Sequence, residues 1–160
     1  MPQPTLAPRV VRSFVQRIAA PPEDVFPLLC PELEKQWLPG WDYRMIHSRS
    51  GVAERGAVFE TRHEAGSTLW VITEHDAPRR VAFARWHPDG VVVHLEISLG
   101  RHLDGDTAVC ITYTHTATDE TSATVVGRLR ESDWLDTMSF WEGSMNAWFE
   151  KRRPQAATSR

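Results

Sequence analysis

The clearest periodic pattern of hydrophobic positions lies near the C-terminus of the chain. Large apolar residues recur there at alternating steps of four and three, at Trp134, Met138, Trp141, Met145 and Trp148. Steps of this size place side chains in one stripe along an α-helix. We therefore expect a helix over residues 132–152, about 30 Å long, with Ser132 or Asp133 as its N-cap.

Residues 41–117 show a different pattern, in which short apolar runs alternate with polar positions and are separated by turn-forming residues. Separators such as Ser50-Gly51 and Pro88-Asp89-Gly90 have turn chemistry. Connections this short join successive strands as antiparallel hairpins. The pattern predicts strands at Tyr43–Ser48, Ala57–His63, Thr68–His75, Arg80–Trp86, Val91–Leu99 and Thr107–Thr116.

The N-terminal part adds one strand and two short helices. Residues 10–20 alternate plainly, although the alternation does not decide which face is buried. Pro21-Pro22 ends this strand, and helices are expected over Glu23–Leu29 and Glu32–Trp37, because acids and prolines are favourable in a first turn. Residues 118–130 are polar and ambiguous.

A sheet of six or seven strands cannot leave its apolar face in water. We therefore expect an α+β fold in which a curved antiparallel sheet wraps around the long C-terminal helix. The two short helices after the first strand would plug one open end. A gap between sheet and helix would form a pocket, with a volume on the order of 300–1,000 Å³ if it holds a ligand.

Several segments then resemble a known superfamily. Residues 18–26 (IAAPPEDVF) precede the helix pair, residues 76–81 (DAPRRV) connect two strands, and an amphipathic helix closes the chain. This succession resembles the START/SRPBCC helix-grip superfamily of birch-pollen-allergen-like, polyketide cyclase and lipid-transfer domains. Residues 37–41 and 56–61 resemble an uncharacterised bacterial branch. The resemblance covers residues 9–152 and implies a hydrophobic ligand cavity. It carries over no catalytic residue, because the superfamily has no shared catalytic motif.

The length of 160 residues favours one domain over residues 9–152, with flexible termini at 1–8 and 153–160. A net charge of −3 provides no basic excess to neutralise phosphates, so nucleic acid is not expected as a partner. Cys30 and Cys110 both lie in apolar runs and are interpreted as buried small hydrophobes.

Unpaired cysteines favour a reducing compartment. The first eight residues lack the apolar core of a signal peptide, and no apolar stretch reaches the length of a membrane span. We therefore expect a cytoplasmic protein, a monomer or a weak homodimer, with no cofactor.

Candidate ligand-binding residues come from the strands and the helix. Alternation over residues 107–116 places Ile111, Tyr113 and His115 inward, because the opposite face is rich in threonine. Tyr113 and His115 are candidate acid–base groups, or else a satisfied core pair. Large aromatic and methionine residues complete the candidate set, at Trp37, Trp41, Phe59, Trp70, Met138, Trp141 and Met145.

Three charged residues lie within apolar strands, at Glu60, Arg62 and Arg85. We interpret them as outward-facing, since an unpaired buried charge is costly. Their parity is ambiguous, because Phe59 competes with Glu60 for the inward face and Trp86 competes with Arg85.

Metal binding and nucleophilic catalysis are not expected. The seven histidines are scattered over strands and turns, and His94 and Glu96 share a strand face that should meet solvent. Cys30 precedes a helix start but has no accompanying base. Neither Ser67 nor Ser144 lies in a nucleophile elbow.

Two functions remain open. The first is binding of an apolar small molecule, such as a lipid, fatty acid or aromatic metabolite, in the cavity between sheet and helix. The alternative is an enzyme of the cyclase, dehydratase or hydrolase type that uses polar residues in the same cavity. An interaction adaptor would need a large exposed apolar patch, and the sequence does not show one clearly.

Overall fold

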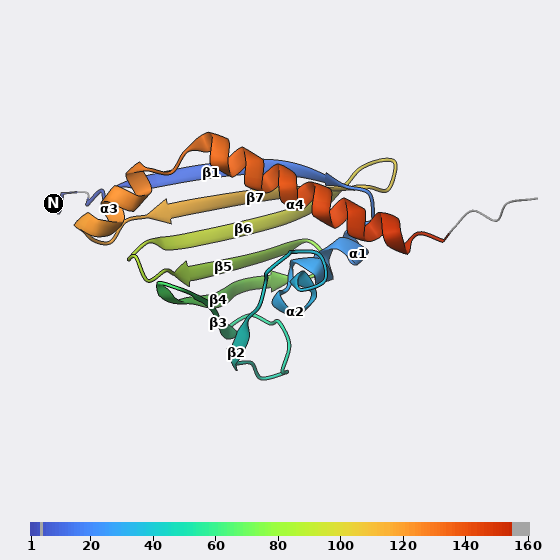
Figure 1. Ribbon diagram of the computed structural model, residues 1–160, viewed down its shortest axis with the longest axis horizontal. Helices are drawn as coiled ribbons and strands as arrows, with labels where there is room; N and C mark the ends of the chain where they lie inside the picture. The colour runs from blue at the N-terminus through green and yellow to red at the C-terminus, as the bar shows by residue number, and fades with distance from the viewer. Residues whose placement is uncertain (4, 155–160) are drawn as a thin grey trace, which may run out of the picture.

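The computed structural model describes residues 1–3 and 5–154. Strand β1 (Arg9–Ile18) leads into helix α1 (Pro22–Val25), the 3₁₀ helix η1 (Phe26–Leu29) and helix α2 (Pro31–Glu34). The strands β2 (Arg44–His47), β3 (Val58–His63), β4 (Gly66–Asp76), β5 (Arg80–Trp86), β6 (Val92–Arg101) and β7 (Thr107–Thr116) follow. Helices α3 (Glu120–Gly127) and α4 (Glu131–Arg152) complete the chain (Figure 1). The expected α+β class is confirmed.

One antiparallel sheet contains all seven strands, in the order β1-β7-β6-β5-β4-β3-β2. Strands β2 to β7 follow the chain as a meander, whereas β1 pairs with β7 and so becomes one edge. Directly opposed residues share a face of the sheet. One such row crosses five strands and faces α4, at Phe59, Trp70, Arg85, Val93 and His115.

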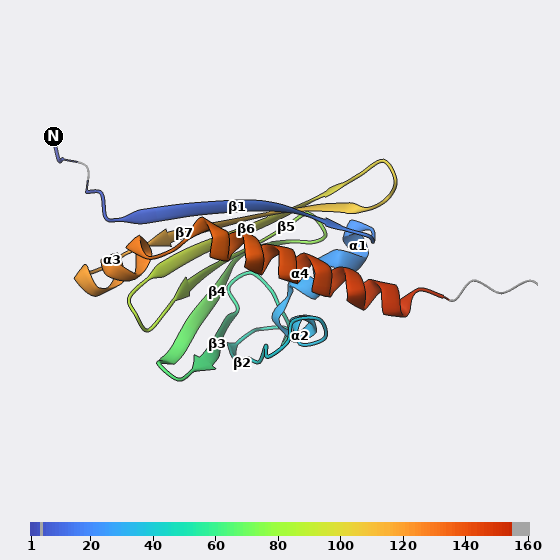
Figure 2. The same cartoon turned by 45° about the horizontal axis from the view of Figure 1, so that its top comes forward.

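Helix α4 lies along the β1 edge of the inner face rather than over its centre (Figures 1 and 2). Of the stripe of large apolar residues, only Met138 and Met145 are fully buried, while its three tryptophans are half-buried. The helix therefore covers the part of the inner face next to β1, while the short helices and the segment after α2 lie over the other part.

Polar side chains of α4 bind the free edge of β1. Trp134 Nε1 donates to the carbonyl of Ser13 at 3.2 Å. The Asn146 side chain accepts from the Ala19 amide at 2.8 Å and donates to the Arg17 carbonyl at 2.9 Å. An edge strand otherwise presents unpaired backbone groups to solvent, so these bonds help to fix the helix against the sheet.

The short helices differ in detail from the expectation. The first is split into α1 and η1, since Pro27 cannot donate the backbone hydrogen bond of an α-helix. The second ends at Glu34 rather than Trp37, which leaves residues 35–43 as an irregular segment.

Helix α3 occupies part of the segment that gave no assignment. Asp119 accepts from the Ser122 amide at 2.8 Å, and the Ser122 hydroxyl in turn accepts from the Asp119 amide at 3.0 Å. This capping box satisfies amides at the helix start.

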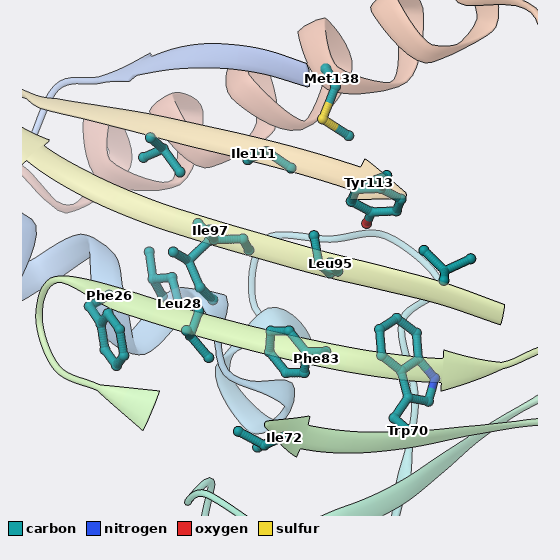
Figure 3. Packing of buried hydrophobic residues seen from close by; sticks show 14 of the residues in the cluster. Phe26, Leu28, Trp70, Ile72, Phe83, Leu95, Ile97, Ile111, Tyr113 and Met138 are labelled. Atoms are coloured by element: carbon teal, nitrogen blue, oxygen red, sulfur yellow. The ribbon is translucent and has the colours of Figure 1, made fainter. Parts of the chain in front are cut away.

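The core lies between the inner face of the sheet, the short helices and α4. Figure 3 shows Trp70, Phe83, Leu95 and Tyr113 on neighbouring strands, with Met138 of α4 on the same side as Tyr113. The expectation that Cys110 is buried is wrong. It is exposed, because it belongs to the threonine-rich outer face of β7 rather than to the core.

The ends of the described chain are tied to the fold at their inner residues. The Ala117 amide donates to the Pro8 carbonyl at 2.9 Å, and the Arg153 side chain donates to the Ala19 carbonyl at 3.1 Å. The flexibility expected for residues 155–160 concerns positions outside the described residues. Within residues 1–3 and 5–154, no helix combines the length and apolarity that crossing a bilayer requires.

Candidate functional site

A cavity lies where α4 leaves the inner face of the sheet uncovered. Its volume is about 110 Å³. This is smaller than the roughly 300–1,000 Å³ expected of a site for a drug-sized ligand. Its wall is made by Gln16, Leu29, Pro31, Glu34, Trp37, Leu38, Trp41, Phe59, Trp70, Phe83, Arg85, Leu95, Ile97, Ile111, Tyr113 and Trp141.

The sheet side of the cavity is an aromatic wall. Phe59 and Trp70 stack with ring centroids 5.4 Å apart and planes at 13°. Phe83 meets the Trp70 ring edge to face, at 6.0 Å between centroids. The Trp70 indole nitrogen donates to the Thr61 hydroxyl at 3.0 Å, which fixes the ring orientation. Such a wall suits a flat apolar molecule.

The segment after α2 closes the cavity from one side. Trp37 Nε1 donates to the Leu28 carbonyl at 2.7 Å, and Trp41 Nε1 donates to the Pro31 carbonyl at 2.8 Å. The Ser144 hydroxyl of α4 also donates to the Trp37 carbonyl. These bonds hold an irregular segment in place between the short helices and α4.

Glu34 brings a carboxyl group to the cavity wall. No hydrogen bond or ion pair among the described residues reaches this carboxyl, although Glu60 on the outer face has Arg44 at 2.8 Å and Arg62 at 3.3 Å. Burial raises the pKa of Glu34 to about 8. The group is therefore largely protonated at neutral pH and is suited to donating or accepting a proton there.

Arg85 also lies on the cavity wall, which corrects the expectation that it faces outward. It is opposed to Trp70 and Val93, so Trp86 takes the outer face and is 50% exposed. The guanidinium carbon lies 5.0 Å from the Trp70 ring centroid and 5.3 Å from that of Tyr113. These cation–π contacts compensate part of the cost of burying the charge.

Tyr113 and His115 face inward, as alternation predicted, with ring centroids 5.8 Å apart. Desolvation raises the pKa of Tyr113 to about 12. Desolvation, together with the positive charges of Arg85 and Arg12, lowers the pKa of His115 to about 4. Both values are far from neutrality, so the pair is poorly matched to acid–base work near pH 7.

A second pocket adjoins the cavity between α4, the segment 128–130 that precedes it, and strands β1, β5 and β7. It has a volume of about 320 Å³ and shares Arg85, Tyr113 and Trp141 with the cavity. Four arginines line it, and we call it the arginine mouth: Arg12, Arg85, Arg128 and Arg130.

The candidate ligand-binding residues fall into three groups. Those on the cavity wall are Trp37, Trp41, Phe59, Trp70, Ile111, Tyr113 and Trp141. His115 and Met138 line the arginine mouth instead. Met145 lines neither space and is 1% exposed, as a core residue.

Sequence reasoning did not select Glu34 or Gln16 for the site. Gln16 is buried and donates to the Met138 carbonyl at 3.0 Å, which joins β1 to α4. Glu34 lies in a short helix whose orientation has no periodic signal. The outward orientation of Glu60 and Arg62 is confirmed by their pairing on the face opposite Phe59.

Cys30 lies in a separate, open apolar pocket of about 520 Å³, between the short helices and the segment around residue 52. Its sulfur is 3.9 Å from His75 Nε2. Burial raises the pKa of the thiol to about 12, so Cys30 is a thiol at neutral pH and a poor nucleophile. Elsewhere in the described chain, no three His, Cys, Asp or Glu side chains converge as metal ligands would.

Comparisons with known proteins place the fold. No family model and no curated protein matches the chain. Norcoclaurine synthase from Thalictrum flavum, as a point mutant with a transition-state analogue, is similar in structure with a TM-score of 0.65 at 12% identity, over 94% of this chain and 100% of that one. An uncharacterised protein from Rhizobium leguminosarum matches with a TM-score of 0.61 at 14% identity, over 92% and 99% of the two chains.

A protein of the dynemicin biosynthetic locus gives a TM-score of 0.57 at 14% identity, over 94% of this chain but 51% of that chain. At identities this low, the similarity shows only that the folds are alike. Together with the sheet and the long C-terminal helix, they show that the chain has the helix-grip fold.

Proposed function

We propose that the protein binds an apolar small molecule in the cavity between the sheet and α4. The observation that carries this proposal is an aromatic wall that faces empty space instead of packing against the closing helix. Core packing normally leaves few voids of this size, because each lost contact costs dispersion energy. An apolar ligand would restore these contacts.

The cavity volume suggests a small, flat molecule or the end of a longer one. Aromatic rings on the wall favour an aromatic metabolite, because offset and edge-to-face ring contacts stabilise more than area alone. The two free cysteines support a role in a reducing compartment such as the cytoplasm. We further propose that the protein acts there as a monomer or weak homodimer.

Native mass spectrometry of freshly purified protein tests the binding proposal. We expect a retained molecule that is released on denaturation, or failing that, saturable fluorescence of the neutral dye N-phenylnaphthylamine. A protein that carries no bound molecule and takes up no dye would contradict the proposal.

Glu34 favours a second candidate function, proton transfer on a bound substrate as in an enzyme of the cyclase or dehydratase type. A carboxyl group with a pKa of about 8 beside an apolar cavity is a plausible acid or base. NMR titration of ¹³C-labelled glutamate, with Glu34→Gln used for assignment, checks this. A Glu34 pKa near its ordinary value of 4.5 would remove the basis for this function.

A further inference from the structure

We propose that the ligand is an amphipathic anion, whose apolar body occupies the cavity and whose anionic head group binds in the arginine mouth to Arg85 and Arg12. This inference rests on the proposed binding function and specifies the chemical class of the ligand. It is carried by the wall that the two adjacent spaces share, the excess of positive charge in the mouth and two buried guanidinium nitrogens without partners.

The cavity and the arginine mouth are adjacent and share part of their walls. Arg85, Tyr113 and Trp141 contribute to the walls of both. A molecule whose body lies against Trp70 would therefore carry its other end past Arg85 into the mouth. The guanidinium carbon of Arg85 lies 5.0 Å from the Trp70 ring centroid, so the positive charge of the mouth begins beside the aromatic wall.

Positive charge dominates the mouth. Its lining includes four arginines, while Asp133 is the single acidic residue of that lining. Asp133 is paired with Arg130, at 3.1 Å between Oδ2 and Nε. Arg12, Arg85 and Arg128 have no carboxylate within ion-pair distance among the described residues.

The two innermost arginines also have unused hydrogen-bond donors. Arg12 Nη2 donates to the Leu129 carbonyl at 3.3 Å, but its Nε is buried without a partner. Arg85 Nε is likewise buried without a partner, although aromatic rings flank its guanidinium group. Buried donors without acceptors are costly, and charged ones more so.

An anionic head group would satisfy both arginines at once. Guanidinium groups match carboxylates in a planar, bidentate geometry, and such charge-assisted bonds are stronger than neutral ones. A neutral hydroxyl or ketone would fill the same space but leave the positive charges uncompensated. The mouth should therefore select the acid over the corresponding alcohol.

Phenylbutyrate and phenylbutanol form a matched pair of probes that differ in this head group. Isothermal titration calorimetry at pH 7 and low salt should show that phenylbutyrate binds at least about tenfold more tightly than phenylbutanol. Arg85→Gln and Arg12→Gln should each weaken phenylbutyrate by about tenfold and change phenylbutanol less than about twofold. Arg85→Lys keeps the positive charge but not the bidentate geometry of the guanidinium group, so it should cause an intermediate loss of phenylbutyrate affinity.

Arg55→Gln is the control, because Arg55 is exposed and lines neither the cavity nor the arginine mouth, and its replacement changes the net charge equally. It should leave both affinities unchanged. Equal affinities for the two probes, or equal losses in the control, would overturn the anion proposal while the binding function stands. Absence of binding by both probes would instead contradict the binding function itself.

Discussion

At the residue scale, charged side chains have different surroundings on the inner and outer faces of the sheet. Glu60 on the outer face is paired with two arginines, which lower its pKa through hydrogen bonds and charge. Glu34 and Arg85 on the inner side have no ion pair with each other or with another described residue. Polar groups in such surroundings stabilise the folded protein little by themselves, and they are better explained by contacts with a ligand.

Replacing Glu34 by glutamine should change how stability depends on pH. The folded-state pKa of about 8 lies above the ordinary value of 4.5, so the folded protein retains a proton that the unfolded chain has lost. The wild-type free energy of unfolding should therefore fall as pH rises from about 4.5 to about 8, through this group. Glu34→Gln removes this loss.

Urea denaturation at pH 5, 7 and 9 checks the prediction. The advantage of Glu34→Gln over the wild type should grow with pH and be largest at pH 9. The control is Glu32→Gln, because Glu32 is exposed and hydrogen-bonded to Tyr43 and Lys35. A constant difference across the three pH values for Glu34→Gln would contradict the assigned pKa.

Phe83→Ala should remove a central part of the aromatic wall. Phe83 is 3% exposed and contacts the rings of Phe59 and Trp70. Replacement should lower the free energy of unfolding by about 3–5 kcal/mol. Urea denaturation measures this, and a loss below about 1 kcal/mol would show that Phe83 is already loosely packed.

At the element scale, α4 and β1 form the unit that sets the cavity. The helix contacts one edge of the sheet, where Asn146 and Trp134 bind backbone groups of β1. The opposite half of the inner face is covered by the segment after α2. The cavity lies where these two covers meet.

Asn146→Ala should weaken the attachment of α4 to the end of β1. It removes both hydrogen bonds, to the Ala19 amide and the Arg17 carbonyl. We expect a loss of about 1–3 kcal/mol and faster hydrogen exchange at the Ala19 amide. Ser139→Ala, on the exposed side of α4, is the control. Unchanged exchange at Ala19 would refute this role.

Asp119→Ala should destabilise α3 by about 1 kcal/mol, because it removes the side chain that accepts from the Ser122 amide. Thermal unfolding with Glu120→Ala as the control measures this. A shift no larger than that of the control would show that the capping box contributes nothing measurable.

The sequence predicts most elements but not their mutual placement. The ranges of β5 and β7 agree with alternation, and α4 agrees to within a residue. The sequence pattern does not predict helix α3, because serine, threonine and valine have low helix propensity. The capping residue Asp119 is the sequence feature that indicates this helix. The stripe on α4 indicates which of its faces packs inward, but not which strand it packs against.

For the candidate site, the sequence predicts the aromatic residues better than the charged ones. Alternation predicts the inward orientation of Tyr113, because its threonine neighbours mark the outer face. Alternation does not predict the orientation of Arg85, because Arg85 and Trp86 compete for one inward position and the usual burial preference favours tryptophan. Long-range register with Trp70 decides that position.

At the scale of the whole molecule, the fold encloses an aromatic cavity that shares part of its wall with the arginine mouth. Both spaces depend on the off-centre position of α4 (Figure 1). A ligand should therefore bind in this cavity.

A variant that fills the cavity tests whether a ligand binds there. Ile97 lines the cavity and is 6% exposed, whereas Val15 is 61% exposed on the outer face of β1. Fluorescence titration with N-phenylnaphthylamine should show saturable binding to the wild type and to Val15→Phe. Ile97→Phe should bind at least about tenfold more weakly while remaining folded by circular dichroism. Equal binding by folded Ile97→Phe would show that the ligand does not bind in the cavity.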